Sequence, residues 1–453
     1  MSRQTASVSI PQEDRRGEEA GAAARWLELR DGVPRVWTRY TDLVAARASG
    51  SWIETIDGER YLDYTSGIGV TNTGHAHPRV VAAIASQAAR GIHLQQNIIF
   101  HQPGLELHER LPGRFPNAAP DERYGLFLSN SGAEAVEAAV KLAKFATGRP
   151  AIVAFRGGFH GRTHAAMALT SSSLKTRGHY EPLLGSVYFA PFPYVLRNPT
   201  GRSEEAALAH SLAAIDELFA TLVAPKDVAA FVVEPILGEG GYIPAPDGFL
   251  PALRAVANRH GILLAVDEIQ TGFARTGRIF ATEWTDATPD IVIMAKGIAS
   301  GLPLSGILAR RALLDAWTPG AHGGTYGGNA VACAAALATL DVIDDEDLAG
   351  NARRQGARLL DGLSRAAAGR ARVAEVRGRG LMIGLELAEG HDLAPRADLA
   401  KALLAEAMAR NVLLLSCGTH AQVVRVIPPL TTTEDEVELA IQAITESLDA
   451  IGA

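Results

Sequence analysis

The sequence contains only two cysteines among its 453 residues, Cys333 and Cys417. Two thiols cannot form the disulfide framework of a small secreted scaffold, and their spacing matches no zinc motif. We therefore expect two buried thiols and no metal site.

Long apolar runs and clusters of basic residues are absent too. No segment has the roughly 18 uninterrupted apolar residues of a membrane-spanning helix, and residues 1–24 lack the apolar stretch of a secretion signal. The formal net charge is −7, and Lys and Arg form no cluster of the kind that nucleic-acid phosphates require. These absences predict a cytoplasmic protein with a loose N-terminal tail and a small-molecule substrate, with neither nucleic acid nor a membrane as partner.

What is present is the composition of a globular protein with a large core, at 47% hydrophobic and 21% charged residues. Short apolar runs with turn residues after each recur in the middle of the chain and predict buried strands over 125–128, 151–155, 229–233, 262–266, 291–294 and 305–308. An amphipathic helix is predicted over 133–147, ending at Gly148. Strands that alternate with helices predict an α/β fold with a mainly parallel sheet.

The pattern changes in the last third of the chain. It predicts helices over 348–368 and 398–410, strands over 412–415 and 423–427, and a final helix that begins after Thr433. We expect a smaller α+β domain there, to which part of the N-terminal segment contributes. The predicted limits are 1–75 for the N-terminal segment, 76–334 for the large domain and 335–453 for the small domain.

Two residues whose side chains could take part in catalysis follow predicted buried strands: Asp267 and Lys296. The carboxyl ends of parallel strands share one edge of a sheet, where open α/β folds bind ligands, so both side chains could face one crevice. Their separation of 29 residues (296 − 267) is about one strand-helix-strand step. The plain alternative for a single lysine is a solvated surface residue.

A candidate anion site lies at the start of the helix predicted over 133–147. Backbone N–H groups at a helix start, with Gly132 for close approach and the Ser131 hydroxyl beside it, can bind phosphate. The plain alternative is that Ser131 is only an N-cap and that Glu134 completes a capping box. A lysine for an imine, an acid for a ring nitrogen and a phosphate site together fit pyridoxal phosphate.

Seven motifs carry a family resemblance, and they follow one another in the family's order. The resemblance covers the chain from about Gly58 to its end. The motifs are Ser131-Gly132-Ala133-Glu134-Ala135-Val136-Glu137, Phe159-His160-Gly161-Arg162-Thr163, Glu234-Pro235-Ile236-Leu237-Gly238-Glu239-Gly240-Gly241, Asp267-Glu268-Ile269-Gln270-Thr271-Gly272, Lys296-Gly297, Gly323-Gly324-Thr325-Tyr326-Gly327-Gly328-Asn329 and Arg425-Val426-Ile427-Pro428-Pro429-Leu430. In these motifs the sequence resembles the class III aminotransferases of the fold type I pyridoxal-phosphate enzymes, and most of all 4-aminobutyrate aminotransferases.

The resemblance implies a large domain that binds pyridoxal 5'-phosphate and a smaller α+β domain. Lys296 would form the covalent link to the cofactor and carry a proton during the reaction, and Asp267 would pair with the ring nitrogen. Thr325 would reach the phosphate of the neighbouring subunit, which implies a homodimer, or a dimer of such dimers. The other implied cofactor-binding residues are Ser131, Gly132 and Ala133 at the phosphate, Phe159 stacked on the ring, Gln270 at the ring hydroxyl, and His160, Glu234 and Ile269.

The resemblance also implies a ping-pong transfer from an ω-amino acid, 4-aminobutyrate, to a 2-oxo acid, 2-oxoglutarate. Arg162 resembles the arginine that binds the donor carboxylate in 4-aminobutyrate and ornithine aminotransferases, and a planar guanidinium suits this task. Ile68 stands where ornithine enzymes carry tyrosine, which favours a donor without a second amine. Glu239 would pair with Arg425 while the donor is bound and release it to the α-carboxylate of the acceptor, although a fixed brace is the alternative.

Two departures from the 4-aminobutyrate subgroup keep other donors open. Phe159 stands where the subgroup usually has tyrosine, and Asn97 where it usually has glutamine. Ring stacking survives the first change, but the second alters the pocket wall, so β-alanine, 5-aminovalerate and a diamine-derived acid remain candidate donors. Ornithine is a further alternative donor. A pyridoxal-phosphate epimerase or decarboxylase of the same fold is a further hypothesis, because it would carry the same cofactor residues.

Overall fold

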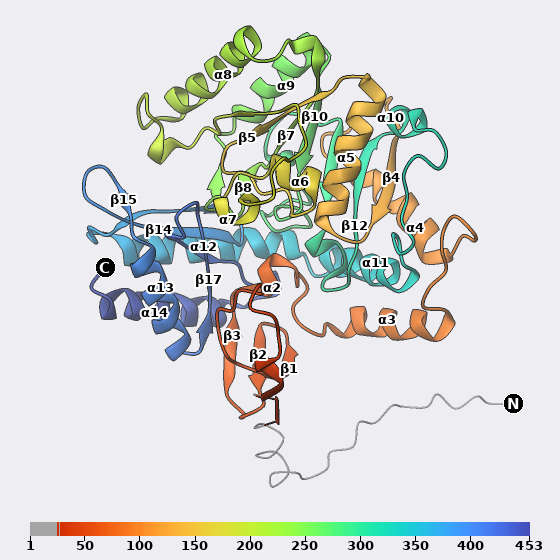
Figure 1. Ribbon diagram of the computed structural model, residues 1–453. Coiled ribbons are helices and arrows are strands. Elements are labelled where there is room, and N and C mark those ends of the chain that lie inside the picture. Colours follow the sequence, from red (N-terminus) through yellow and green to blue (C-terminus); the bar gives the residue numbers. More distant parts are fainter. Residues whose placement is uncertain (1–24, 27) are drawn as a thin grey trace, which may run out of the picture.

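The computed structural model describes residues 25–26 and 28–453. The predicted N-terminal tail, residues 1–24, lies outside the described residues. The described chain forms a large upper body around one sheet, with smaller sheets and helices from both ends of the chain below it (Figure 1).

A seven-stranded sheet forms the centre of the large body, in the order β4 (Tyr124–Ser129), β12 (Ser305–Arg310), β11 (Ile291–Met294), β10 (Leu263–Asp267), β7 (Val228–Val233), β5 (Ala151–Phe155) and β6 (Val187–Ala190). β12 is antiparallel to both of its neighbours, and the other pairs are parallel. The prediction of an α/β fold with a mainly parallel sheet is confirmed, and all six predicted strands are present within two residues of their predicted ends. The sequence patterns do not predict β6, the half-buried edge strand.

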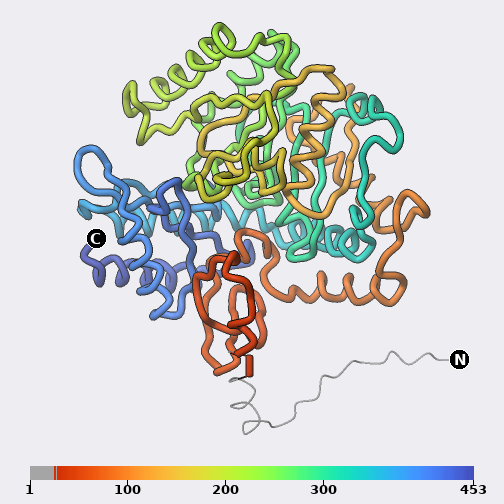
Figure 2. The backbone as a smooth tube through the Cα atoms, in the orientation of Figure 1, coloured from red at the N-terminus to blue at the C-terminus, as the bar shows by residue number. Residues whose placement is uncertain are grey.

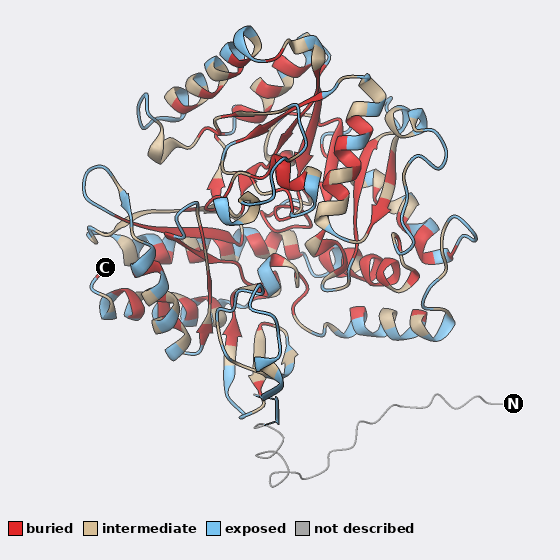
Figure 3. Cartoon of the chain, viewed as in Figure 1, coloured by how far each residue is buried: buried red, intermediate tan, exposed pale blue. Residues whose placement is uncertain are grey.

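Helices cover both faces of this sheet (Figure 1), and its strands are almost entirely buried (Figure 3). Along β5, Ile152 and Ala154 pack with α5 (Gly132–Thr147) and α6 (His164–Leu169), whereas Val153 and Phe155 pack with α8 (Glu204–Thr221) and α9 (Phe249–His260). Successive side chains of a strand point to opposite faces, so a sheet covered twice needs strands that are apolar throughout.

The small body contains a five-stranded sheet made of β13 (Val373–Arg379), β14 (Met382–Glu389), β18 (Val423–Val426) and β17 (Leu415–Cys417), with β15 (Ala394–Pro395) paired to β14. Three helices accompany it, α12 (Leu348–Ala367), α13 (Ala397–Ala409) and α14 (Glu434–Ala450). Thr433 caps α14 in a capping box with Glu436, as the sequence predicts for the start of this helix.

The two ends of the described chain meet in a four-stranded sheet of β1 (Ala45–Ser49), β2 (Trp52–Thr55), β3 (Arg60–Asp63) and β16 (Val412–Leu413). β16 pairs with β3, and Figure 2 shows the red start of the chain beside its blue end. The single strand predicted over 412–415 is wrong, because the chain changes sheet at Leu414 and forms β16 and then β17.

The almost fully buried helix α11 (Ala330–Asp345) packs against α3 (Pro78–Arg90) and α4 (Gln102–Arg110) and links the two bodies. It is continuous through residue 334, and the domain limits 1–75, 76–334 and 335–453 stay a prediction.

The remaining short elements are α2 (Ser66–Gly69), α7 (Leu174–Arg177), α10 (Arg311–Ala316), β8 (Ile236–Leu237), β9 (Ile243–Pro244) and the 3-10 helices η1 (Pro112–Arg114), η2 (Val195–Arg197), η3 (Pro225–Asp227), η4 (Ala281–Trp284) and η5 (Lys296–Ala299). Over residues 25–26 and 28–453, no helix is long and apolar enough to cross a membrane.

Candidate active site

The parallel strands β4, β5, β7, β10 and β11 end at one edge of the large sheet, and the segments after them line a cavity of about 420 Å³. This is the edge at which open α/β sheets bind ligands. The cavity gathers twelve of the sixteen residues that the sequence predicts for the site: Ser131, Gly132, Ala133, Phe159, His160, Arg162, Glu234, Glu239, Asp267, Ile269, Gln270 and Lys296.

The other four predicted residues do not line the cavity. Arg425 lies behind Glu239 and contacts its carboxylate. Ile68 has an exposed side chain, and its neighbour Val70 lines the cavity instead. Asn97 and Thr325 are exposed outside it.

Sequence reasoning also missed several lining residues. Asn130 precedes Ser131 within the predicted anion site, so its place next to that motif was a usable signal. Gly161 and Gly238 lie within quoted motifs, and Ala295 precedes Lys296. The rest carry no such signal, because small and apolar residues suggest only core packing; they are Val70, Gly301, Leu302, Pro303 and Leu304.

Lys296 begins η5 with a φ of 49°, in the left-handed region that non-glycine residues rarely occupy. Such a conformation persists where the surroundings require it, and it is common at functional sites. Gly297 must be small, since a Cβ there would lie 2.3 Å from Nδ2 of Asn72. Burial lowers the pKa of the Lys296 amine below its usual value, against the attraction of the Glu239 and Asp267 carboxylates.

Asp267 ends β10 and is held by two contacts. Its Oδ2 lies 2.7 Å from Nδ1 of His160, and its Oδ1 accepts a hydrogen bond from the Ile269 amide at 3.1 Å. Burial alone would lower the pKa of His160, but the hydrogen bond and charge of Asp267 raise it overall. These contacts fix the Asp267 side chain in the wall of the cavity.

The start of α5 is where the sequence predicts an anion site. The Ser131 hydroxyl accepts from the Glu134 amide at 3.3 Å, and the Glu134 carboxylate accepts from the Ser131 amide at 3.1 Å, so the capping box is present. The next two amides, of Gly132 and Ala133, have no acceptor within the described part of the chain and line the cavity. The capping box and the anion site are thus compatible.

Phe159 and Arg162 form the opposite wall. The Arg162 guanidinium lies 5.3 Å from the centre of the Phe159 ring, and the described residues offer it no ion-pair partner. Glu234 accepts from the amides of Phe159 and Gly238, each at 2.8 Å, and so joins this turn to the loop that carries Glu239. Burial raises the pKa of Glu234 to about 7, although the nearby His160 charge opposes the rise.

Glu239 closes the cavity on the side of the small body. Its carboxylate contacts Nη1 of Arg425 on β18, a side chain that is 2% exposed. Burial raises the pKa of Glu239, but the Arg425 charge and hydrogen bond outweigh it, so the pKa lies below its usual value. Both groups are therefore ionised at neutral pH.

The donor set fits pyridoxal phosphate. Oε1 of Gln270 is buried without a hydrogen-bond partner in the described chain, beside a cavity that also holds an acid, an amine, a flat aromatic ring and free helix-start amides. The orphaned amide oxygen requires a donor, which the ring hydroxyl would supply. A group of three or more metal-binding side chains occurs nowhere among the described residues.

Comparisons with known proteins agree with this geometry. A model of the family "Aminotransferase class-III" matches residues 35–448. The chain is 38% identical to 5-aminovalerate aminotransferase DavT of Pseudomonas aeruginosa over 92% of this chain and 96% of that protein, and 38% identical to 4-aminobutyrate aminotransferase GabT of Escherichia coli with the same coverage. Among solved structures it is similar to the PLP-bound form of an amine transaminase from an uncultivated Pseudomonas species, with a TM-score of 0.84, 33% identity and coverage of 99% of this chain and 100% of that one.

The family match extends over almost the whole described chain, and it includes every segment that lines the cavity. The cavity residues fit pyridoxal phosphate, the cofactor that the resemblance of these motifs implies. The protein therefore belongs to the class III aminotransferases.

Proposed function

We propose that the protein is a pyridoxal-phosphate-dependent ω-amino acid aminotransferase that transfers the amino group of 4-aminobutyrate to 2-oxoglutarate by a ping-pong mechanism. One observation carries the proposal. Arg162 lines the cavity and is unpaired among the described residues, whereas Arg425 lies behind the cavity wall and is paired with Glu239.

This asymmetry suits the two substrates. An ω-amino acid has one carboxylate, far from its amine, which Arg162 can bind while Arg425 stays paired with Glu239. A dicarboxylic 2-oxo acid brings a second carboxylate next to the reacting carbon, and this group can replace Glu239 at Arg425. Exchange of one carboxylate for another avoids an unpaired buried charge, which would cost several kcal/mol.

The cavity residues have distinct roles in this reaction. When bound, pyridoxal phosphate supplies an electron sink for the pair left by the departing proton. Asp267 would keep the nitrogen of the cofactor ring protonated. Phe159, whose own ring lies beside the Arg162 guanidinium, would orient the cofactor ring. Lys296, whose pKa burial lowers, holds the cofactor and then moves the proton from the donor's amine-bearing carbon. Gly132 and Ala133 bind the phosphate with their amides.

The relatives support the substrate class. DavT and GabT are named for 5-aminovalerate and 4-aminobutyrate, two ω-amino acids that differ by one methylene. A methylene changes binding by only about 1–3 kcal/mol, so both donors belong in the test.

We also propose a cytoplasmic homodimer, or a dimer of such dimers. Segments 93–97 and 323–328 lie side by side, with the His93 and Tyr326 rings 5.2 Å apart, and they carry Asn97 and Thr325. The same region exposes a set of large apolar side chains, which a second copy would cover: Ile92, Ile98, Ile99, Phe100 and Tyr326. In such a dimer, Thr325 would serve the partner's cavity and not its own.

The test is a donor panel. The holoenzyme is mixed with 4-aminobutyrate, 5-aminovalerate, β-alanine or ornithine without acceptor, and the absorbance of the bound cofactor is followed through one turnover. We expect 4-aminobutyrate to react fastest and 2-oxoglutarate to restore the spectrum. A lasting preference for another donor would correct the substrate, whereas no lasting change with any donor would indicate an epimerase or decarboxylase.

A further inference from the structure

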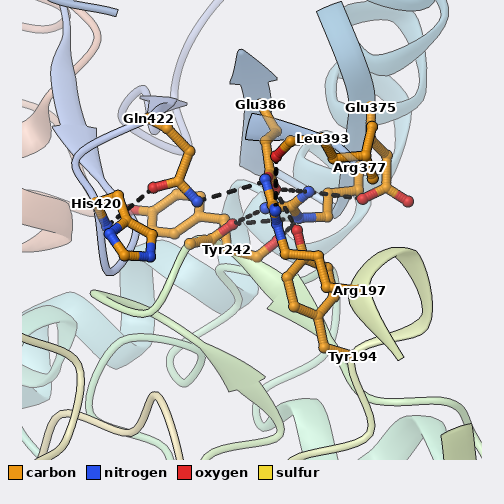
Figure 4. Close-up of polar contacts among 10 residues, drawn as sticks. Tyr194, Arg197, Tyr242, Glu375, Arg377, Glu386, Leu393, His420 and Gln422 are labelled. Carbon is orange, nitrogen blue, oxygen red and sulfur yellow. Dashed lines mark hydrogen bonds and ion pairs between the residues drawn. The ribbon is translucent and has the colours of Figure 1, made fainter. Parts of the chain in front are cut away.

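A buried charged cluster lies outside the cavity, next to the loop of residues 238–242 that joins β8 to β9, here called the Glu239 loop. The side chains of Tyr194, Arg197 and Arg377 converge on Glu386, which is fully buried on β14 (Figure 4). Tyr194 and Arg197 come from the large body, and the other two from the small sheet. The proposed reaction uses none of these residues.

Arg377 is the member of this cluster that reaches the loop. Its Nη1 lies 2.6 Å from Oε2 of Glu375 and 2.7 Å from Oε2 of Glu386. Its Nη2 donates to the Gly241 carbonyl at 2.6 Å, and its Nε donates to the carbonyls of Gly241 and Tyr242 at 3.2 and 3.1 Å. One guanidinium therefore joins two carboxylates to the backbone that follows Glu239.

The sheet places Arg377 and Arg425 on either side of this loop. Arg377 on β13 is the register partner of Gly384 on β14, and Gly384 is in turn the partner of Arg425 on β18. Residues directly opposite one another in a sheet point to the same face. Gly384 has no side chain between the two arginines, and a Cβ there would lie 2.9 Å from Cβ of Tyr242. The loop therefore lies over Gly384.

The loop is thus attached at separate points. Arg377 binds its carbonyls at Gly241 and Tyr242, the Gly418 amide donates to the Glu239 carbonyl at 2.9 Å, and Arg425 contacts the Glu239 carboxylate. Only the last contact has to break when an acceptor arrives. With its backbone held, Glu239 can leave and return by rotation of its side chain alone.

We propose that Arg377 is a positioning residue that fixes the Glu239 loop over Gly384 and thereby sets the preference of the enzyme between ω-amino and α-amino donors. This inference rests on the proposed exchange of carboxylates at Arg425. Loss of the Arg377 contacts lets the loop move from the sheet, which weakens the Glu239–Arg425 pair and leaves Arg425 free more often. The reaction with the ω-amino donor then slows, and the reaction with the α-amino donor does not.

The experiment compares Arg377→Lys with Arg197→Lys in the holoenzyme, using single turnovers with 4-aminobutyrate and with L-glutamate. Arg197 makes two hydrogen bonds to Glu386 and one to the Leu393 carbonyl but none to the loop, so it is a matched control within the same cluster. We expect Arg377→Lys to slow 4-aminobutyrate by about fivefold to tenfold, as the loss of charge-assisted hydrogen bonds warrants. L-glutamate should change less than about twofold, and Arg197→Lys should leave the ratio of the two rates unchanged.

Two further variants separate positioning from damage to the fold. Gly384→Ala should shift the ratio in the same direction, because it displaces the loop without removing a charge. In a Glu239→Gln background, Arg377→Lys should cause no further shift, because Arg377 acts through Glu239. Equal slowing of both donors by Arg377→Lys, or an equal shift of the ratio by Arg197→Lys, would overturn the proposal.

Hydrogen exchange of the amides of residues 238–242 distinguishes failure of this inference from failure of the proposed function. Faster exchange in Arg377→Lys but not in Arg197→Lys supports positioning, and unchanged exchange overturns it. If Glu239→Gln itself leaves the ratio of the two donor rates unchanged, the proposed exchange of carboxylates at Arg425 is wrong. The proposed effect of Arg377 on donor preference is then wrong as well.

Discussion

The carboxylate of Glu239 lies against the guanidinium of Arg425, but the two partners are unequally buried: the Glu239 side chain is 29% exposed and that of Arg425 2%. Arg425 is fixed on β18, whereas Glu239 stands at the wall of the cavity with room to turn away. An incoming carboxylate can therefore replace the acid, and the arginine remains in place.

Glu239→Gln tests this exchange. The neutral side chain pairs weakly with Arg425, so we expect about tenfold slower single turnovers with 4-aminobutyrate, in the range for one lost charge-assisted contact. The reaction with L-glutamate should be unharmed or faster, because Arg425 is then always available. Equal slowing of both, or a loss of thermal stability alone, would indicate a fixed brace.

Arg162→Lys tests the donor site. The lysine keeps the charge but loses the planar fork, so the reaction with 4-aminobutyrate should fall by about tenfold or more, whereas the affinity for pyridoxal phosphate should change little. Single-turnover kinetics and cofactor titration give the two values. A parallel loss of both would assign Arg162 to the structure of the Phe159 turn.

Borohydride reduction tests the covalent link. The reduced holoenzyme should carry the cofactor on the peptide that contains Lys296, as read by mass spectrometry. Lys296→Ala should still bind the cofactor, through α5 and Asp267, but should retain none after reduction and denaturation, and its turnover should fall by several orders of magnitude. Cofactor attached to another lysine would contradict the assignment.

Mixed dimers test the shared site. Lys296→Ala and Thr325→Asp chains should each be inactive alone, because the first lacks the amine and the second places a negative charge at the partner's phosphate. In a mixed dimer one site collects both defects and the other neither, so about a quarter of the wild-type activity should return after equal mixing and full subunit exchange. No recovery despite proven exchange would place Thr325 outside the partner's site.

The pH dependence of the apoprotein's stability tests the burial of Lys296. Because the folded protein holds the pKa of this amine below its usual value, burial of Lys296 costs stability at neutral pH. The penalty is full below the folded pKa and fades as the pH rises to the ordinary value of 10.5. Lys296→Met should therefore raise the free energy of unfolding of the apoprotein at pH 7, read as a higher melting temperature, and the gain should vanish at high pH. A gain that does not depend on pH would come from packing alone.

Much of the large body was predictable because its signals are local. An apolar run bounded by turn residues forms a buried strand wherever helices cover both faces, so β5 and β11 match their predictions residue for residue. Ser131 and Thr433 each cap the helix that follows, because an N-cap acts only on the next turn. Lys296 and Asp267 line the same cavity because two neighbouring parallel strands end beside each other.

Local signals could not predict which strands pair or which side chain of a segment faces inward. The run at 412–415 is uniformly apolar, yet its first half pairs with β3 and its second with β18. Ile68 and Val70 are alike as residues, and the left-handed backbone around Ile68 turns Val70 toward the cavity. These outcomes depend on partners far away in the chain.

The sequence by itself therefore determined the α/β sheet, its strand-end lysine and acid, the capped helix start beside the cavity and the aminotransferase family. The tertiary structure alone decided that Arg377, Gly384 and Arg425 stand side by side, with the Glu239 loop lying over the glycine. Strand register places these residues together, and register is set by hydrogen bonds and packing between segments that no local periodicity connects.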